Sequence, residues 1–236
     1  MNEQLKQWVK ESRRIVFFGG AGVSTESGIP DFRSQDGLYN MKYKYPPETI
    51  ISHGFFMRET EEFYRFYRDK MLFPDAQPNA AHRKLAQWEQ EGKLLAVVTQ
   101  NIDGLHQAAG SKKVYELHGS VHRNYCTRCG QFYDLDFIMK GQGIPKCEKC
   151  GGTIKPDVVL YGENLDNDVI NGACSAIAAA DMLIIGGTSL AVYPAAGLID
   201  LYRGHRLVLV NLSQTPQDAR ADLVIHERIG QVFSEL

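Results

Sequence analysis

Two cysteine pairs constrain the fold of this chain more than any other feature of its sequence. Cys126-x2-Cys129 and Cys147-x2-Cys150 are separated by residues 130–146, a spacing typical of a four-cysteine zinc ribbon. Each pair can form a tight knuckle that presents two thiolates, and two knuckles together complete a tetrahedron. Because four thiolates leave no open position for water or substrate, we predict one structural zinc ion.

A redox-active CxxC motif and a nucleic-acid-binding ribbon are the competing interpretations of these cysteines. Two CxxC motifs at ribbon spacing disfavour the redox interpretation. The loop between the pairs is not notably basic, and the whole chain has a net charge of −2 and a pI of about 6.4. We therefore expect no direct binding of nucleic acid. The fifth cysteine, Cys174, lies in an alanine-rich stretch and is expected to be a small buried residue.

Short apolar segments alternate with helical stretches along the rest of the chain. Such continuous apolar segments are typical of parallel strands that are buried on both faces of a sheet. The predicted strands are Ile15–Phe18, Leu95–Thr99, Met182–Ile185, Leu207–Val210 and Leu223–Ile225. The predicted helices are Asn79–Gln90, with Asn79 as its cap, Asp166–Ala180 and roughly Pro194–Tyr202. This alternation predicts an α/β fold with a Rossmann-like, doubly wound parallel sheet.

Two stretches interrupt the alternation and predict a small second domain. Residues 32–75 are rich in aromatic side chains and partly helical, and residues 119–156 contain the cysteine pairs. We predict that this helical insertion and the zinc-binding module together form the small domain. The Rossmann-like domain then comprises residues 1–31, 76–118 and 157–236.

A glycine-rich turn, residues 19–28, follows the first predicted strand. Such a turn at the start of a helix can bind a pyrophosphate on its backbone N–H groups. The usual dinucleotide fingerprint is incomplete, because Thr25 occupies the position of its third glycine. The acidic residue that usually binds the adenosine ribose is also missing from residues 99–101, after the next strand. A purely structural turn remains an alternative, and NAD bound here should lie in a different orientation from that in a dehydrogenase.

Polar residues also follow two later strands, at residues 186–189 and 211–213. The carboxyl ends of parallel strands meet at one edge of a doubly wound sheet. Three polar strand ends together therefore predict one extended nucleotide site, although any single one could be a helix cap.

The sequence resembles the sirtuin family over nearly its whole length. The resemblance is carried by residues 20–24 (GAGVS), 28–34 (GIPDFRS), 99–106 (TQNIDGLH), 117–120 (LHGS), 187–189 (GTS) and 210–212 (VNL), with the zinc cysteines after the LHGS motif. It implies a Rossmann-like domain, a small zinc-bearing domain and a cleft between them for NAD and acyl-lysine. It also implies a bacterial-type, NAD-dependent protein lysine deacetylase. In such an enzyme the acyl oxygen attacks the nicotinamide ribose, nicotinamide leaves, and the acetyl group ends on ADP-ribose.

The resemblance assigns roles to individual residues of the cleft. It implies that His118 is the general base for a ribose hydroxyl, a task that suits a side chain titrating near neutral pH. Asn101 and Asp103 are implied to hold the ribose and nicotinamide, although Asp103 could instead only cap a helix. Phe32 and Arg33 match a mobile loop that shields the ribose from water. The implied NAD contacts are Gly20, Ala21, Gly22, Ser24, Thr25, Phe32, Arg33, Gln100, Asn101, Ile102, Asp103, His118, Gly187, Thr188, Ser189, Asn211, Leu212, Arg228 and Ile229.

The resemblance also implies that acetylated protein lysines bind as extended peptides. Residues 158–163 and 190–193 match two segments between which a peptide adds as a strand, so main-chain hydrogen bonds give affinity with little sequence selectivity. The Tyr161 ring, where phenylalanine is common in the family, should pack along the lysine stem. The implied substrate contacts are Tyr64, Tyr67, Val159, Tyr161, Gly162, Glu163, Val192 and Tyr193.

The acyl group is predicted from a helical pair of the small domain. Family members that prefer succinyl- or malonyl-lysine have a Tyr-x-x-Arg pair there, whereas this chain has Tyr64 and Tyr67 in the register that we favour. Without the arginine an acidic acyl chain loses its charge-assisted partner, so we expect a preference for acetyl and other neutral groups. Arg68 lies on a neighbouring helical face and could reverse this preference.

Two alternative functions remain open for the same NAD site. One is ADP-ribosyl transfer to protein, for which His118 would be less essential. The other is a non-enzymatic module that binds NAD or ADP-ribose, which would not need a base beside the ribose. The amino terminus has no apolar signal core and no segment is long enough to span a membrane, so we expect a cytoplasmic protein without membrane contact. No heptad or large apolar surface helix indicates obligate assembly, so we expect a monomer.

Overall fold

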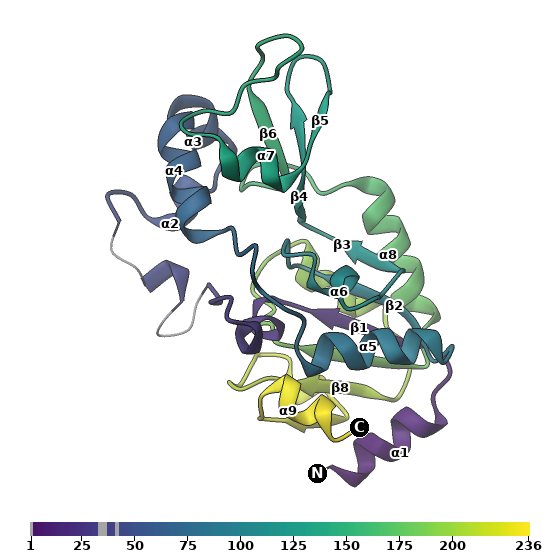
Figure 1. The fold of residues 1–236 in the computed structure, drawn as a ribbon. Helices are drawn as coiled ribbons and strands as arrows, with labels where there is room; N and C mark the ends of the chain where they lie inside the picture. Colours follow the sequence, from purple (N-terminus) through teal and green to yellow (C-terminus); the bar gives the residue numbers. More distant parts are fainter. Residues whose placement is uncertain (1, 33–36, 41–42) are drawn as a thin grey trace.

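The computed structural model describes residues 2–32, 37–40 and 43–236, and its largest element is a six-stranded sheet (Figure 1). All neighbouring strands of this sheet are parallel, in the order β3-β2-β1-β7-β8-β9. The order reverses between β1 and β7, which is the topological switch point of a doubly wound sheet. The strands are β1 Ile15–Gly19, β2 Leu94–Thr99, β3 Val114–Glu116, β7 Met182–Gly186, β8 Leu207–Val210 and β9 Leu223–Ile225.

Helices cover both faces of this sheet because alternate strand residues point to opposite sides. On one face, Phe17 and Ile184 share a core with α1 (Glu3–Glu11), α5 (Ala80–Gln90) and α9 (Ile229–Ser234). On the other face, Phe18 and Ile185 pack with α8 (Asn167–Ala179) and the 3-10 helix Ala195–Leu201. The predicted Rossmann-like fold is therefore confirmed.

The predicted strands and helices are found within one residue of their expected ends. The central strands β1 and β7 are buried along their whole length, which explains their continuous apolar sequence. The Asn79 side chain accepts from Ala81 N, as expected of a cap, and Asp166 caps α8 in the same way. The stretch predicted as a helix over Pro194–Tyr202 is a 3-10 helix. Cys174 is half-buried rather than buried, which corrects the expectation for this residue.

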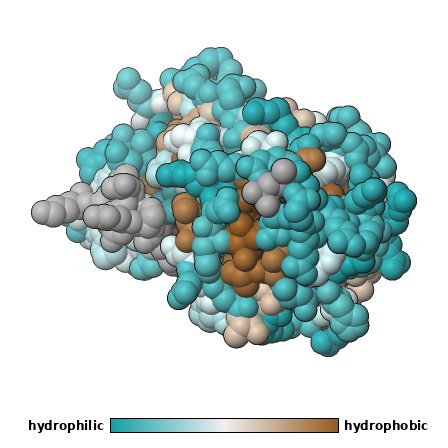
Figure 2. Space-filling view, turned by 90° about the horizontal axis from the view of Figure 1, so that it is seen from below, coloured by the Kyte–Doolittle hydropathy of each residue, from teal (hydrophilic) through white to brown (hydrophobic). Residues whose placement is uncertain are grey.

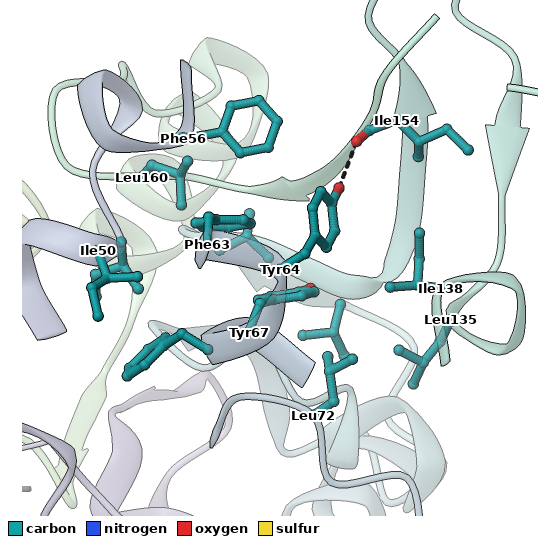
Figure 3. Packing of buried hydrophobic residues seen from close by; sticks show 14 of the residues in the cluster. Ile50, Phe56, Phe63, Tyr64, Tyr67, Leu72, Leu135, Ile138, Ile154 and Leu160 are labelled. Atoms are coloured by element: carbon teal, nitrogen blue, oxygen red, sulfur yellow. Dashed lines mark hydrogen bonds between the residues drawn. The ribbon is translucent and has the colours of Figure 1, made fainter. Parts of the chain in front are cut away.

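A smaller antiparallel sheet, in the order β5-β4-β6, forms the other part of the molecule. Its strands are β4 Gly119–Cys126, β5 Phe132–Tyr133 and β6 Ile154–Val158. The neighbouring helices are α2 Pro47–Ile50, α3 His53–Arg58, α4 Thr60–Lys70 and α7 Leu135–Lys140. Residues 38–72 and 121–160 contribute to one shared hydrophobic core, part of which Figure 3 shows. This core supports the predicted small domain, whose boundaries remain a prediction.

The remaining elements are short. They are α6 Leu105–Ala108 and the 3-10 helices Ala21–Val23, Thr25–Ser27, Leu38–Asn40 and Asp218–Arg220. Within residues 2–32, 37–40 and 43–236, each helix is too short or too polar to cross a bilayer. Figure 2 shows the molecule from below, where hydrophilic side chains surround one compact apolar area. The predicted monomeric state remains a prediction.

Candidate functional site in the cleft

A cavity of about 1170 Å³ lies at the carboxyl ends of the parallel strands. This volume exceeds the usual range of about 300–1,000 Å³ for small-molecule pockets, so the cavity has room for a ligand as large as a dinucleotide. Its walls come from both sheets, since residues after β1, β2, β7 and β8 face residues of β4 and of the segment after β6. The sequence-predicted site residues that line it are Gly20, Ala21, Gly22, Ser24, Thr25, Phe32, Gln100, Asn101, Ile102, Asp103, His118, Val159, Tyr161, Gly162, Glu163, Gly187, Thr188, Ser189, Val192, Tyr193, Asn211, Leu212, Arg228 and Ile229.

Two glycine-rich turns contact each other at the switch point. Gly22 N donates to Gly187 O at 2.8 Å, and a Cβ on Gly22 would lie only 2.8 Å from Gly187 Cα. Gly187 itself has a φ of 59°, a conformation that favours glycine. The backbone approach between the turns therefore depends on the absence of side chains, and it leaves the 20–22 backbone facing the cavity.

A hydrogen-bonded chain joins three polar side chains beside the first turn. Asn101 Nδ2 donates to Ser24 Oγ at 3.1 Å, and Ser24 Oγ donates to Asp103 Oδ2 at 2.6 Å. The other carboxylate oxygen of Asp103 accepts from Leu105 N at 2.9 Å, at the start of α6. Asp103 therefore lines the cavity and also accepts a hydrogen bond from the first residue of α6, although the N-cap position itself is Gly104.

His118 lies where the chain passes from the parallel sheet to the small sheet, two residues after β3 and directly before β4. The next residue, Gly119, has a φ of 75°, and a Cβ on it would clash with Asp157 O. His118 Nδ1 lies 3.0 Å from Gln100 O, and since a carbonyl only accepts, Nδ1 must carry the proton. This tautomer leaves Nε2 as an acceptor.

The protonation of His118 also suits a base. Burial lowers the pKa of His118 below its ordinary value, and the hydrogen bond to Gln100 O offsets only part of that effect. His118 is therefore neutral at pH 7. An imidazole that is neutral and held in one tautomer can accept a proton from a group in the cavity.

The four cysteines form a compact cluster outside the cavity. Their sulfurs lie within 4.8 Å of one another, and Sγ of Cys129 is 3.4 Å from that of Cys150 and 3.6 Å from that of Cys147. Four thiolates at about 2.3 Å from zinc would be separated by about 3.8 Å, so the cluster fits the ion. A hydrogen bond from the Tyr133 hydroxyl, at 3.2 Å, lowers the pKa of the Cys147 thiol to about 6. None of the four cysteines lines the cavity, as expected of a structural zinc site.

The predicted substrate residues Tyr64 and Tyr67 do not line the cavity. Both are fully buried in α4, and Tyr64 Oη donates to Ile154 O at 2.5 Å (Figure 3). Arg68 is also directed into the small domain, because its guanidinium donates to Ile138 O and to the carbonyl of residue 143. The residue roles predicted for this helix are therefore not supported. The predicted NAD contact Arg33 lies outside the described residues.

His122 is a cavity residue that sequence reasoning missed. It lies on β4, and its Nε2 donates to Asp103 O at 3.0 Å. Val121 N also donates to Ile102 O at 3.0 Å. These bonds tie the small sheet to the loop that carries Asp103. No motif indicated this position, and the signal that could have found it is its place four residues after His118, on the strand that begins directly after that histidine.

The comparisons with known proteins agree with this geometry. The sequence profile described as the Sir2 family matches residues 20–194, which is most of the chain. The chain belongs to the Sir2 family. Among its Sir2 relatives is a protein of Clostridium acetobutylicum named NAD-dependent protein deacetylase, which is 62% identical over 98% of this chain and 95% of the relative. A protein of Clostridium perfringens with the same name is 61% identical over 99% of this chain and 97% of the relative.

Solved Sir2 structures have the same fold. One contains a Sir2 protein with a p53 peptide and NAD+; it has a TM-score of 0.89, is 42% identical, and the match covers 100% of this chain and 97% of that one. Another contains a deacetylated p53 peptide and 3'-O-acetyl ADP-ribose; it has a TM-score of 0.91 and 41% identity over 98% of this chain and 95% of that one. The parallel sheet, the small sheet and the cleft between them are thus family features.

A buried histidine pair lies behind the Asp103 loop of this Sir2 protein. The rings of His82 in α5 and His106 in α6 are 4.7 Å apart, and both side chains are almost completely buried. Burial lowers the pKa of His82 to about 4, although Asp103 acts in the opposite direction, and it lowers the pKa of His106 well below its ordinary value. In the unfolded chain both histidines bind protons as the pH falls below about 6.5, whereas in the folded protein both stay neutral until the pH is much lower.

Acidification should therefore destabilise the protein before its carboxylates titrate. Between pH 6.5 and 5 we expect His82 alone to lower the free energy of unfolding by about 1.6 kcal/mol, with His106 acting in the same direction. Urea denaturation at both pH values measures this loss. His82→Gln keeps an acceptor for Asn79 N but cannot titrate, so it should flatten the pH dependence. The same pH slope in both proteins would contradict the assignment.

Proposed function

We propose that this Sir2 protein is an NAD-dependent protein lysine deacetylase, which transfers the acetyl group of acetyl-lysine to ADP-ribose and releases nicotinamide and free lysine. The observation that carries the proposal is the position of His118. Its acceptor Nε2 is left free by the bond from Nδ1 to Gln100 O, and the residue lines the same cavity as Asn101 and Asp103. A binding module would not need a base held in this way. Relatives more than 60% identical carry the deacetylase name.

Different residues of the cavity have different roles in the proposed reaction. When bound, NAD would supply the ADP-ribose that accepts the acetyl group, and its nicotinamide would leave. His118 Nε2 takes the proton from a ribose hydroxyl. Asn101 and Asp103, linked through Ser24, hold the ribose and the carboxamide. Phe32 packs against Tyr39 at the cavity, where it excludes water from the reacting carbon.

The peptide binds as an extended strand between residues 158–163 and 190–193. Support for this comes from the cavity, which residues of both segments line, and from the exposed rings of Tyr161 and Tyr193 at its mouth. Main-chain hydrogen bonds would supply most of the affinity. The related structures include one with an acetylated peptide bound to Sir2, at 40% identity.

Zinc completes the proposed holoenzyme. The cysteine cluster holds one ion, whose role is to fold the small sheet rather than to take part in the reaction. Reduced thiolates fit a reducing compartment, so a cytoplasmic location is part of the proposal.

The first experiment follows an acetyl-lysine peptide and nicotinamide together. The purified zinc-loaded protein is incubated with the peptide, with and without NAD, and both products are quantified by mass spectrometry. We expect loss of the acetyl group only with NAD, matched one-for-one by nicotinamide. Nicotinamide without deacetylation would instead support ADP-ribosyl transfer, and NAD binding with neither product would support a binding module. The same peptide without the acetyl group is the control.

We also propose that the protein prefers neutral acyl groups over succinyl and malonyl groups. This preference rests on the cations that line the cavity rather than on Tyr67. Among the described residues, the lysines and arginines that line the cavity are Lys70 and Arg228. Lys70 Nζ lies 3.1 Å from Asp69 Oδ2, which neutralises it. Arg228 follows β9, at the opposite edge of the sheet from β3 and His118. An acidic acyl chain therefore meets no unpaired cation among these residues.

A succinyl-lysine peptide should have a kcat/KM about 10- to 100-fold below that of the acetyl peptide. The factor corresponds to one missing charge-assisted hydrogen bond, worth about 1.5–3 kcal/mol. Both peptides are compared at saturating NAD, with a propionyl peptide as the neutral control of intermediate size. Equal rates for the succinyl and acetyl peptides would contradict the preference.

A further inference from the structure

Glu163 lies at the cleft, but its carboxylate is bonded to the protein itself. One oxygen, Oε1, lies 2.8 Å from His53 Nδ1, and the other, Oε2, lies 3.0 Å from Lys155 Nζ. Oε2 also accepts from Leu160 N at 2.9 Å. The side chain is only 19% exposed, so water competes weakly for these positions. A carboxylate with this many internal partners has little capacity left for a substrate.

The partners of Glu163 come from both halves of the small domain. Lys155 lies on β6 of the zinc-bearing sheet, and its Nζ also donates to Val158 O at 3.0 Å. His53 is the first residue of α3 in the helical insertion. Glu163 therefore connects these two halves at the point where the chain leaves β6.

The segment between β6 and Glu163 is the one proposed to pair with the peptide. Its backbone is fixed on both sides: Val159 N donates to His118 O at 3.0 Å, and Tyr161 N donates to Ile51 O at 3.0 Å. His53 N in turn donates to Tyr161 O at 2.9 Å. Leu160 N, between these bonds, has the Glu163 carboxylate as its partner. The carboxylate thus fixes the backbone N–H at the centre of this turn.

The ionisation of Glu163 is consistent with this arrangement. Burial raises the pKa of Glu163, but the bonds from Leu160 N, His53 and Lys155 outweigh it and hold the pKa below its ordinary value. The carboxylate is therefore charged throughout the neutral range. Hydrogen bonds to an ionised group are about twice as strong as neutral ones.

We propose that Glu163, held by Lys155 and His53, is a positioning residue that fixes the 159–162 segment for the acyl-lysine peptide. The inference rests on the proposed function and assigns Glu163 a different part from that expected from the sequence, which was direct substrate contact. In this arrangement the 159–162 segment is already ordered before the peptide strand binds to it. Without the carboxylate the 159–162 segment becomes ordered only when the peptide binds, and the free energy of that ordering lowers the peptide affinity.

The test measures peptide and NAD binding separately. Glu163→Gln is expected to raise the Kd of a fluorescently labelled acetyl-lysine peptide about tenfold, measured by anisotropy, while the Kd of NAD changes less than about twofold. Steady-state assays should show the same division, with a higher KM for the peptide and a nearly unchanged kcat. Asp200→Asn is the matched control, because it removes an exposed carboxylate from an ion pair with Arg220 on the parallel-sheet domain.

Two further variants separate positioning from general loss of structure. Lys155→Met should reproduce the peptide defect, and Lys155→Arg, which keeps the charge, should restore affinity to within about threefold of wild type. Because the two side chains act as a unit, the double variant Lys155→Met/Glu163→Gln should bind the peptide no more weakly than the weaker-binding single variant. Zinc content and melting temperature are recorded for every variant.

The outcomes distinguish this inference from the proposed function. Wild-type protein that binds the acetyl peptide without deacetylating it would overturn the proposed function. The peptide Kd of Glu163→Gln relative to wild type would then still decide the positioning role. Deacetylation by the wild type, with the same peptide Kd in Glu163→Gln, would overturn the positioning role alone. A parallel rise of the Kd values for peptide and NAD would also overturn it, since a general loss of structure would then explain the defect.

Discussion

His118→Ala should lower kcat for deacetylation about 10²- to 10⁴-fold, the usual contribution of a positioned general base. The variant removes the Nε2 acceptor that the Gln100 carbonyl orients, and an alanine side chain cannot accept the ribose proton. The Kd of NAD should change little, because the contacts of the 20–24 turn and the Asn101–Ser24–Asp103 chain remain. Single-turnover assays with saturating NAD and peptide measure the loss directly.

His205→Ala is the control for this experiment, since His205 is exposed and does not line the cavity. It should keep the wild-type rate. The pH profile provides a second check. Because burial lowers the pKa of His118, the apparent pKa of the acid limb of kcat/KM should lie below the ordinary pKa of histidine. Full deacetylation by His118→Ala would remove the base from the mechanism, whereas full NAD turnover without deacetylation would favour ADP-ribosyl transfer.

Cys126→Ala should abolish zinc binding and unfold the small sheet. Cys126 is buried, with its sulfur 3.5 Å from that of Cys150, and it ends β4. Structural zinc contributes apparent free energies of about 10–16 kcal/mol in zinc-finger peptides, more than a small sheet of this kind can lose. Zinc content by atomic emission and limited proteolysis within residues 119–160 report the two effects.

Cys174→Ala is the matched control for this variant, because Cys174 lies on α8 outside the cysteine cluster. It should retain one zinc per chain and the wild-type proteolytic pattern. Retention of one zinc by Cys126→Ala, with an unchanged melting temperature, would show that the four-thiolate site has been assigned wrongly.

The parallel sheet was predictable because its central strands are buried on both faces. Phe17 and Phe18 are adjacent, yet each is fully buried against a different layer of helices. Such strands have to be apolar throughout, which is a strong pattern in a sequence. The edge strand β3 was not predicted, because it has three residues and only Glu116 among them is buried. Its identity depends on pairing with β2, which the local sequence does not encode.

The site residues on strand ends and glycine turns line one cavity, because each belongs to a motif whose backbone position is fixed, while their individual roles stay predictions. Tyr64 and Tyr67 show the limit of this reasoning. The residues of α4 that a resemblance aligns with a pocket are packed instead against β6 and α7, because Phe63, Tyr64, Phe66 and Tyr67 are all buried. What the apolar face of a helix contacts is decided by its neighbours, and the aromatic face of an amphipathic helix such as α4 can pack into a core as well as line a pocket.

The Glu163 contacts lie beyond sequence reasoning for a different reason. His53 and Glu163 are 110 positions apart, with His53 in the helical insertion and Glu163 in the segment that follows β6. Nothing in either segment indicates the other, and the pairing exists only once β6 and α3 have packed. Charged side chains are common on surfaces, so an isolated histidine or glutamate carries little information about its partner.

The place of His118 between β3 and β4 has a consequence for motion of the two sheets. A rotation of the zinc-bearing part about this crossover displaces each atom in proportion to its distance from the axis. The cysteine cluster at the far end of β4 would travel furthest, and His118 would hardly move. An opening of this kind would leave His118 bonded to Gln100 O, so the proposed base would stay aligned while the peptide exchanges.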